Sequence, residues 1–203
     1  MKTYLCHFSE EPITLDGNLN KEPWKSMESL ELVETATGNK PLQRTIAKMC
    51  YTKESLYVVF SCIDDEINAV MTNYNDPIYN EEVVEIFIDA TGELKQYIEI
   101  EVSPLNTVLH YAIHNHGGKV RGFARVDQVI KSVAKVSDDH WVVEMEIPLD
   151  ELTDQAISSG TSWKGNLYRI DRRKNGEDEY SAWNATHEIN FHRPECFGEI
   201  VFE

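Results

Sequence analysis

In two stretches of the sequence, acidic and aromatic residues occur at every second position, which is the spacing of side chains on one face of a strand. They are EVVEIFID (82–89) and QYIEIEVS (96–103). Successive side chains of a strand point to opposite faces, so each stretch has an apolar face and a second face of another type. That second face carries Glu85, Phe87, Asp89, Tyr97, Glu99 and Glu101. Because carboxylates accept hydrogen bonds and aromatic rings offer apolar area, these residues predict a face that can bind a ligand.

Metal and redox chemistry have less support in the sequence. His110 and His114 are four residues apart on a predicted strand. That spacing is roughly 13 Å, too far for one metal ion. The cysteines have neither a CxxC pair nor zinc-ligand spacing, so we expect buried or idle thiols. In a simple hairpin Cys50 would lie opposite Tyr57, and its distance from Cys62 would then be too large for a disulfide.

Short strands dominate the predicted secondary structure, and they must position the chemical side chains. Ten or more segments rich in β-branched and aromatic residues recur at roughly 10-residue spacing. Helical periodicity is limited to short candidates at 21–27, 148–152 and 154–159, with no βαβ alternation, repeat or linker. The pattern predicts an all-β, antiparallel two-sheet sandwich with one or two short helices, in a single domain over residues 1–203.

The apolar faces of the same strands predict the core. Alternation places one set of side chains together between the sheets: Ile86, Ile88, Ile98, Ile100, Val143 and Met145. We also expect Trp24, Trp141 and Trp163 in the core. A sandwich of this length can bury enough apolar area to fold without disulfides.

The chain is strongly acidic. Its 203 residues include 19 Lys+Arg and 35 Asp+Glu, which gives a formal net charge of −16. Such a charge repels phosphate backbones and anionic lipid surfaces, so we expect neither nucleic acid nor a membrane as partner. No apolar run approaches the roughly 18 residues that cross a bilayer, and the N-terminal residues show no export signal.

Several longer motifs occur in an order that resembles one known family. They are ITLDGNLNKEPW (13–24), IYNEEVVEIFID (78–89), HWVVEMEIPLDEL (140–152), WKGNLYRID (163–171), EYSAWNAT (179–186) and FHRPECFGEIVF (191–202). Over nearly the whole chain they resemble the family 9 carbohydrate-binding modules. The resemblance implies an immunoglobulin-like Greek-key β-sandwich that binds a saccharide between two tryptophans without catalysis. It also implies structural calcium and a place in extracellular polysaccharide metabolism.

The resemblance assigns sugar-binding roles to particular residues. The first clamp aromatic of the family stands six residues before the Glu of VEIFID, which is Tyr79 ahead of Glu85 here, and the second is Trp183 in the YxxW segment. Tyr79 departs from the family tryptophan but can still stack on a sugar. We expect Arg169 to pair with Asp171 or Glu85, either as a structural pair or to hold Glu85 ionised for a ligand, and we include Asn184 among the sugar contacts.

Calcium would need dispersed oxygen ligands, because the sequence has no EF-hand loop. The candidates near predicted strand ends are Asp16, Asp64 and Asp65. We expect any bound calcium to be structural, and no other cofactor is required.

One alternative is a glycoside hydrolase on the same sandwich. Hydrolysis needs two carboxylates about 5 to 5.5 Å apart in retaining enzymes, or ~6.5 to 9.5 Å apart in inverting ones. The acidic residues that could supply a pair are Glu85, Glu99, Glu101, Glu144 and Glu146, although no hydrolase strand motif accompanies them.

A second alternative is a haem-binding, cytochrome-like domain, because haem binders of the DOMON-like kind share this sandwich. Axial ligands would come from Met49, Met71, Met145, His110 or His114. The sequence contains no CxxCH motif for covalent haem attachment.

Overall fold

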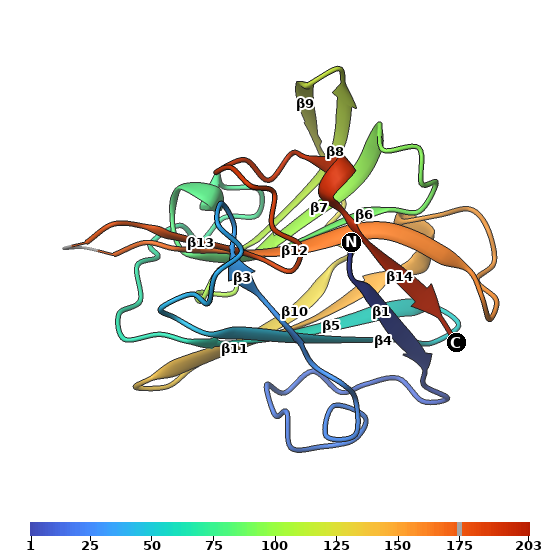
Figure 1. Cartoon of the computed structure of the whole chain (residues 1–203). Coiled ribbons are helices and arrows are strands. Elements are labelled where there is room, and N and C mark those ends of the chain that lie inside the picture. The colour runs from blue at the N-terminus through green and yellow to red at the C-terminus, as the bar shows by residue number, and fades with distance from the viewer. Residues whose placement is uncertain (174–175) are drawn as a thin grey trace.

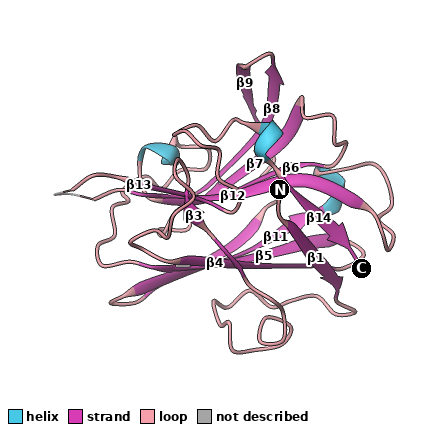
Figure 2. Ribbon diagram, viewed as in Figure 1, coloured by secondary structure: helices cyan, strands magenta, loops and turns pink. Residues whose placement is uncertain are grey.

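Strands are the main regular secondary structure of the computed structural model, which describes residues 1–173 and 176–203 (Figure 2). One sheet, here called the β5 sheet, contains β10 (Lys131–Val136), β11 (His140–Pro148), β5 (Ser55–Ile63), β4 (Thr45–Tyr51) and β2 (Leu30–Glu31). The other, the β6 sheet, contains β14 (Gly198–Phe202), β12 (Ser162–Asp171), β6 (Val83–Asp89), β7 (Gln96–Val102), β8 (Val108–His116), β9 (Lys119–Ala124), β13 (Glu179–Ala182) and β3 (Val33–Glu34). The two sheets form the layers of a curled β-sandwich (Figure 1), which confirms the predicted fold class.

Helical structure in the described residues is limited to short 3-10 turns. These are η1 (Ile78–Asn80), η2 (Leu149–Glu151) and η3 (Pro194–Cys196). Of the predicted helical segments, 148–152 contains η2, whereas 21–27 and 154–159 form turns and bends. No helix in the described part of the chain is long and apolar enough to cross a membrane.

The first strand, β1 (Thr3–Phe8), joins the two sheets. Its residues Thr3–Cys6 run parallel to β14, and His7 and Phe8 run parallel to β4. The sequence predicted only antiparallel pairs, and the remaining described pairs are antiparallel. Alternation along β1 fixes which side chains face inward but not which strands lie beside it, so its parallel pairing was not predictable.

The β4–β5 hairpin has the register that the sequence predicted. Cys50 lies opposite Tyr57, and Cys62 lies opposite Thr45. Cys50 and Cys62 are therefore free thiols, and both are buried.

The main core fills the space between the sheets. Ile86, Ile88, Ile100, Val143 and Met145 are buried there together, as predicted, and the half-buried Ile98 packs against them. Trp141 and Trp163 belong to the same cluster, whereas Trp24 is buried in a second cluster with Tyr57 and Val59. Period-two alternation was therefore sufficient to identify the core strands.

The outer face of the β6 sheet is covered in part by the segment between β13 and β14. Phe191 in that segment stacks on Tyr168 of β12 with ring centroids 4.1 Å apart, and the Tyr168 hydroxyl donates to the Phe191 carbonyl at 2.9 Å. Tyr97 of β7 and His192 are joined by a hydrogen bond of 2.8 Å between hydroxyl and Nδ1. This cover turns an exposed sheet face into the wall of a cavity.

Candidate functional site

A cavity of about 430 Å³ opens on the outer face of the β6 sheet. Its volume lies within the range of roughly 300–1,000 Å³ that is usual for small-molecule sites. Buried carboxyl groups and partly exposed aromatic rings line it together: Glu85, Glu99, Glu101, Tyr79, Tyr111, Tyr180 and Phe191. The combination is that of a site with directional polar groups inside and apolar surfaces at the entrance.

Strand register brings the three carboxyl groups together. Glu85 of β6 lies directly opposite Glu101 of β7, and Phe87 lies opposite Glu99. Glu99 in turn faces Tyr111 of β8. Carboxylate oxygens of Glu85, Glu99 and Glu101 lie within 4.8 Å of one another, and we call these three residues the Glu85 triad. The shared face predicted from alternation is confirmed, but its carboxyl groups are buried rather than solvated.

Burial and mutual repulsion make the triad weakly acidic. Burial first, and the nearby Glu99 second, raise the pKa of Glu85 well above its ordinary value. Burial likewise raises the pKa of Glu101 well above its ordinary value, and it raises the pKa of Glu99 to about 7. Oε1 of Glu85 lacks a hydrogen-bond partner among the described residues. The triad therefore retains protons near neutral pH.

Positive charge is scarce around the triad. Among the described residues that line the cavity there is no lysine or arginine. His192 lines it, but burial lowers the pKa of its imidazole, so the ring is neutral. The described lining thus gathers three carboxyl groups without a lysine or arginine, and the nearest described guanidinium that acts on Glu85 is that of Arg172, outside the lining.

A cation does hold two of the aromatic residues from outside the cavity lining. Arg172 donates to the Tyr79 carbonyl at 2.8 Å and to the Tyr180 hydroxyl at 2.7 Å. Its guanidinium also lies over the Tyr180 ring, 5.4 Å from the centroid, and pairs with Asp178. These contacts hold η1, which contains Tyr79, and the Tyr180 ring on β13 in fixed positions relative to each other.

Tyr111 has room for its ring because its neighbour on β9 lacks a side chain. A Cβ added to Gly122 would lie 2.7 Å from Cδ2 of Tyr111, closer than real Cβ contacts. Glycine at this position therefore lets the ring lie against β9, where it lines the cavity.

Two predicted sugar-binding residues line the cavity, and Trp183 does not. Tyr79, 44% exposed, and Glu85 are both part of the lining. Trp183 is 2% exposed and belongs to the core between the sheets, where its ring packs against Gly198. The clamp role predicted for Trp183 is therefore wrong. Tyr180, which stands an odd number of residues before it and so faces the opposite side, takes the position in the cavity.

Asn184 and Arg169 also have structural positions. The Asn184 side-chain oxygen accepts from the backbone N–H of Lys2 at 2.8 Å, and the Asn184 backbone N–H donates to Asn166 Oδ1 at 2.9 Å. Arg169 is buried and pairs with Asp64 at 2.8 Å. Arg169 also lies 3.8 Å from Asp171, one of its two predicted partners, whereas Tyr168 lies beside Glu85, the other. The sugar contacts predicted for Asn184 and Arg169 are therefore corrected, because both side chains hold parts of the fold together.

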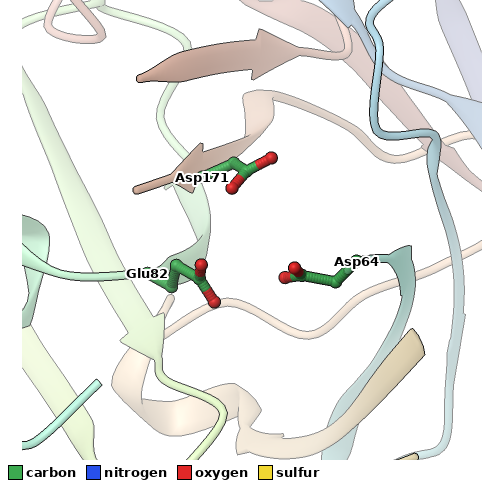
Figure 3. Close-up of side chains that lie close together, drawn as sticks. All are labelled: Asp64, Glu82 and Asp171. Carbon is green, nitrogen blue, oxygen red and sulfur yellow. The ribbon is translucent and has the colours of Figure 1, made fainter. Parts of the chain in front are cut away.

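A second acidic cluster lies on the opposite side of the β6 strand. Figure 3 shows Asp64, Glu82 and Asp171 with carboxylates directed toward one another, and their oxygens lie within 4.8 Å. We call these residues the Asp64 cluster. They come from the end of β5, the residue before β6 and the end of β12.

The Asp64 cluster contains both paired and unpaired oxygens. Asp64 Oδ2 accepts from Arg169 at 2.8 Å and from Trp141 Nε1 at 2.9 Å. Neither oxygen of Glu82 has a hydrogen-bond partner among the described residues. Burial and the charge of Asp64 raise the pKa of Glu82 to about 8. Three carboxylates with spare oxygens suit a hard divalent cation, so the cluster fits the calcium that the sequence predicted.

The other predicted calcium ligands lie elsewhere. The Asp16 carboxylate pairs with Lys21 and accepts from the Asn18 N–H at 2.9 Å. Asp65 is exposed, because it follows the buried Asp64 directly and points to the other side. Only Asp64 of the predicted set therefore belongs to a cluster, and the sequence reasoning missed its partners Glu82 and Asp171.

Of the carboxylates considered for a hydrolase, Glu85, Glu99 and Glu101 lie together in the cavity, whereas Glu144 and Glu146 lie elsewhere. Glu144 is buried under the N-terminal loop, where it accepts from Trp24 Nε1 at 2.6 Å, and Glu146 pairs with Lys131. Both lie on the β5 sheet, away from the triad. Met49 and Met145, considered as haem ligands, are buried in the core.

Comparisons with known proteins agree with this fold. Residues 15–203 match the family model described as carbohydrate family 9 binding domain-like. A protein from Bacteroides uniformis ATCC 8492 that is predicted to bind carbohydrate is similar, with a TM-score of 0.82 and 17% identity over 100% of this chain and 99% of that one. No curated protein sequence matches the chain.

A family 9 carbohydrate-binding module from Caldicellulosiruptor kristjanssonii is also similar in structure. Its complex with cellotriose gives a TM-score of 0.71 at 19% identity, over 100% of this chain and 94% of that one. A complex with glucose gives a TM-score of 0.66 at 18% identity, over 98% and 95% of the two chains. At these identities the likeness concerns the fold.

Proposed function

Because the chain belongs to the family of carbohydrate family 9 binding-like domains, we propose that it is a non-catalytic module that binds a mono- or oligosaccharide in the cavity on the β6 sheet. The observation that carries this proposal is the presence of three buried carboxyl groups beneath aromatic rings in one cavity. Such a module would serve polysaccharide metabolism by holding a saccharide rather than cleaving it.

Sugar chemistry matches this lining. The C–H faces of a pyranose are apolar and pack against aromatic rings, while its hydroxyl groups need partners with defined directions. Tyr79, Tyr180 and Phe191 supply the rings, and Glu85 supplies a carboxyl group inside the cavity. The related module from Caldicellulosiruptor kristjanssonii was crystallised with cellotriose and with glucose, which are saccharides of this kind.

The test is a glycan-array screen followed by titration calorimetry with two variants. Tyr79→Ala should weaken binding, because stacking that buries about 100 Å² of apolar area is worth on the order of 2.5 kcal/mol, or roughly 60-fold in affinity. Phe8→Ala is the matched control, because Phe8 is an exposed aromatic outside the cavity, 41% against 44% for Tyr79. Equal loss in both variants, or a protein that binds no saccharide, would contradict the proposal.

We also propose that the Asp64 cluster holds a structural calcium ion. Glu82 offers carboxylate oxygens without hydrogen-bond partners among the described residues. Asp171, whose Oδ2 lies 3.8 Å from Arg169, and Asp64, from the other sheet, complete the set. An ion there would join the ends of β5, β6 and β12. A calcium-dependent rise in melting temperature that Glu82→Gln abolishes would support this role.

A further inference from the structure

We propose that the Glu85 triad selects a saccharide unit that carries a free amine, and that its three carboxyl groups bind the ammonium. This inference rests on the proposed function, because it names the ligand class of the same cavity. It begins from the charge of the lining, which has three acidic groups and, among the described residues, no lysine or arginine.

A neutral sugar would use the aromatic rings and single carboxyl groups of this lining, but it does not need three acidic groups in one place. Each hydroxyl group both donates and accepts, so a site for neutral sugars gains from a mixture of acceptors and donors. An ammonium group donates three hydrogen bonds and accepts none. The triad, which supplies acceptors from three separate residues, has the complementary composition.

The spacing of the triad also suits an ammonium group. Three acceptors that each lie about 2.8 Å from a tetrahedral nitrogen are about 4.6 Å from one another. The oxygens of Glu85, Glu99 and Glu101 lie within 4.8 Å of one another. One carboxyl oxygen from each residue can therefore accept one N–H.

Unpartnered buried oxygens point to a missing donor. Glu101 is 0% exposed and lines the cavity, where its hydrogen-bonding neighbour is another acid, Glu99. Glu85 is 2% exposed, and its Oε1 has no hydrogen-bond partner among the described residues. A buried polar atom without a partner costs about 1–3 kcal/mol, and more when it is charged. A ligand that donates to these atoms would remove that cost.

The aromatic rings favour an organic cation over a metal ion. Tyr79, Tyr111, Tyr180 and Phe191 line the same cavity. Rings attract ammonium groups through their negative faces, and aromatic cages are a known way to bind such groups. A metal ion would bind the carboxylates, but its binding would gain little from the aromatic rings that line the rest of the cavity.

Binding should be linked to proton release. The titratable or charged groups that face the triad are Tyr79, Tyr111, Tyr168, Tyr180, His192 and Arg172. Burial raises the pKa of Tyr111 and Tyr168 and lowers the pKa of His192, so the triad itself exchanges the protons. An entering ammonium favours the ionised carboxylates and displaces a proton to solvent. Affinity should therefore rise from pH 5.5 to 7.0, while the amine stays protonated.

The test compares glucosamine with glucose and N-acetylglucosamine, each as monomer and β-1,4-linked dimer, by titration calorimetry with a chelator present. We expect the amine to bind at least tenfold tighter than both neutral sugars at pH 7.0, with an enthalpy that changes with the ionisation enthalpy of the buffer. Glu101→Gln should remove at least tenfold of the amine affinity and change the neutral-sugar affinity much less. Glu146→Gln, on the other sheet, is the control and should bind like wild type.

Other outcomes separate this inference from the proposed function. If glucose binds as tightly as glucosamine, the amine selectivity is wrong although saccharide binding stands. If glucose binds only with added calcium, and Glu101→Gln abolishes that binding, the triad holds a metal ion and the inference is also wrong. If no saccharide binds at all, the proposed function fails with it. Thermal melts identify a misfolded variant, and Glu99→Gln then replaces Glu101→Gln.

Discussion

Glu82 and Glu85 are three residues apart on one stretch of chain, yet they belong to different acidic clusters on opposite sides of the β6 sheet. Glu82 joins the Asp64 cluster, which contains the guanidinium of Arg169. Glu85 joins a triad that lies in an aromatic-lined cavity without a described lysine or arginine. An odd separation along an extended chain was enough to send the two side chains to these different environments.

The two clusters differ in whether a described cation pairs with their carboxylates. In the Asp64 cluster, Arg169 lies 2.8 Å from Asp64 and 3.8 Å from Asp171, so the fold itself provides most of the pairing. Both clusters contain carboxylate oxygens without hydrogen-bond partners among the described residues, but no described lysine or arginine lines the cavity of the triad. Sites that a protein keeps at a loss of stability are commonly functional. The contrast therefore assigns folding to the Asp64 cluster and ligand binding to the triad.

The largest predicted effect is on the free energy of unfolding, and it comes from the Asp64 cluster. Arg169→Met should lower the free energy of unfolding by about 3–5 kcal/mol, because it leaves Asp64 and Asp171 buried without their cation. Denaturant unfolding measures this change. Lys131→Met, which breaks an exposed pair with Glu146, should lower it by less than about 1 kcal/mol. Equal effects of the two substitutions would mean that the buried pair has no special role.

Calcium should stabilise the fold through the Asp64 cluster. An ion at one hundred times its dissociation constant stabilises a protein by about 2.7 kcal/mol, which is roughly 5–10 °C in melting temperature for a chain of this size. Calcium should raise the melting temperature of wild type by this amount, and Glu82→Gln should remove the response. Asp65→Asn is the control, because Asp65 is exposed beside the cluster and should keep the response. A response that survives Glu82→Gln places the ion elsewhere.

The sandwich, its core and one face of the candidate site could be predicted from alternation alone. Glu85, Glu99 and Glu101 were placed on one face because strand neighbours are two residues apart, and register then brought them together. Tyr79 came from a family position in the sequence and lines the cavity.

The rest of the site depends on contacts between distant segments. Phe191 reaches the cavity because its segment folds over Tyr168, and Tyr111 lies there because Gly122 makes room for its ring. The partners of Asp64 come from strands that meet only in the sandwich. Trp183 was misassigned because its role was taken from a position in the family pattern alone. Trp183 and Tyr180 are three residues apart, so their side chains point to opposite faces of the sheet. Alternation through β13 would have placed Tyr180 in the cavity and Trp183 in the core.

A pair of aromatic substitutions tests that correction. Tyr180→Ala should lower saccharide affinity by about 2.5 kcal/mol, or roughly 60-fold, with little change in stability. Trp183→Ala should do the reverse, because deleting a buried tryptophan costs about 3–5 kcal/mol of folding free energy. Calorimetry and denaturant unfolding of both variants separate the two roles. An affinity loss in a stable Trp183→Ala variant would restore Trp183 to the site.

The smallest effect comes from the pH dependence of the triad. Burial raises the pKa of Glu99 from its ordinary value to about 7, so its protonated form is the one that the folded state favours. Stability from this proton is fully present below the unfolded pKa, near 4.5, and is lost as the pH rises through about 7. Glu99→Gln holds the neutral form at every pH. The variant should therefore match wild type near pH 4 and be more stable than wild type at pH 8. Denaturant unfolding at both pH values measures the difference, with Glu146→Gln as the control. A wild type whose stability does not fall between these pH values would show that the triad is already paired in the free protein, and the contrast with the Asp64 cluster would disappear.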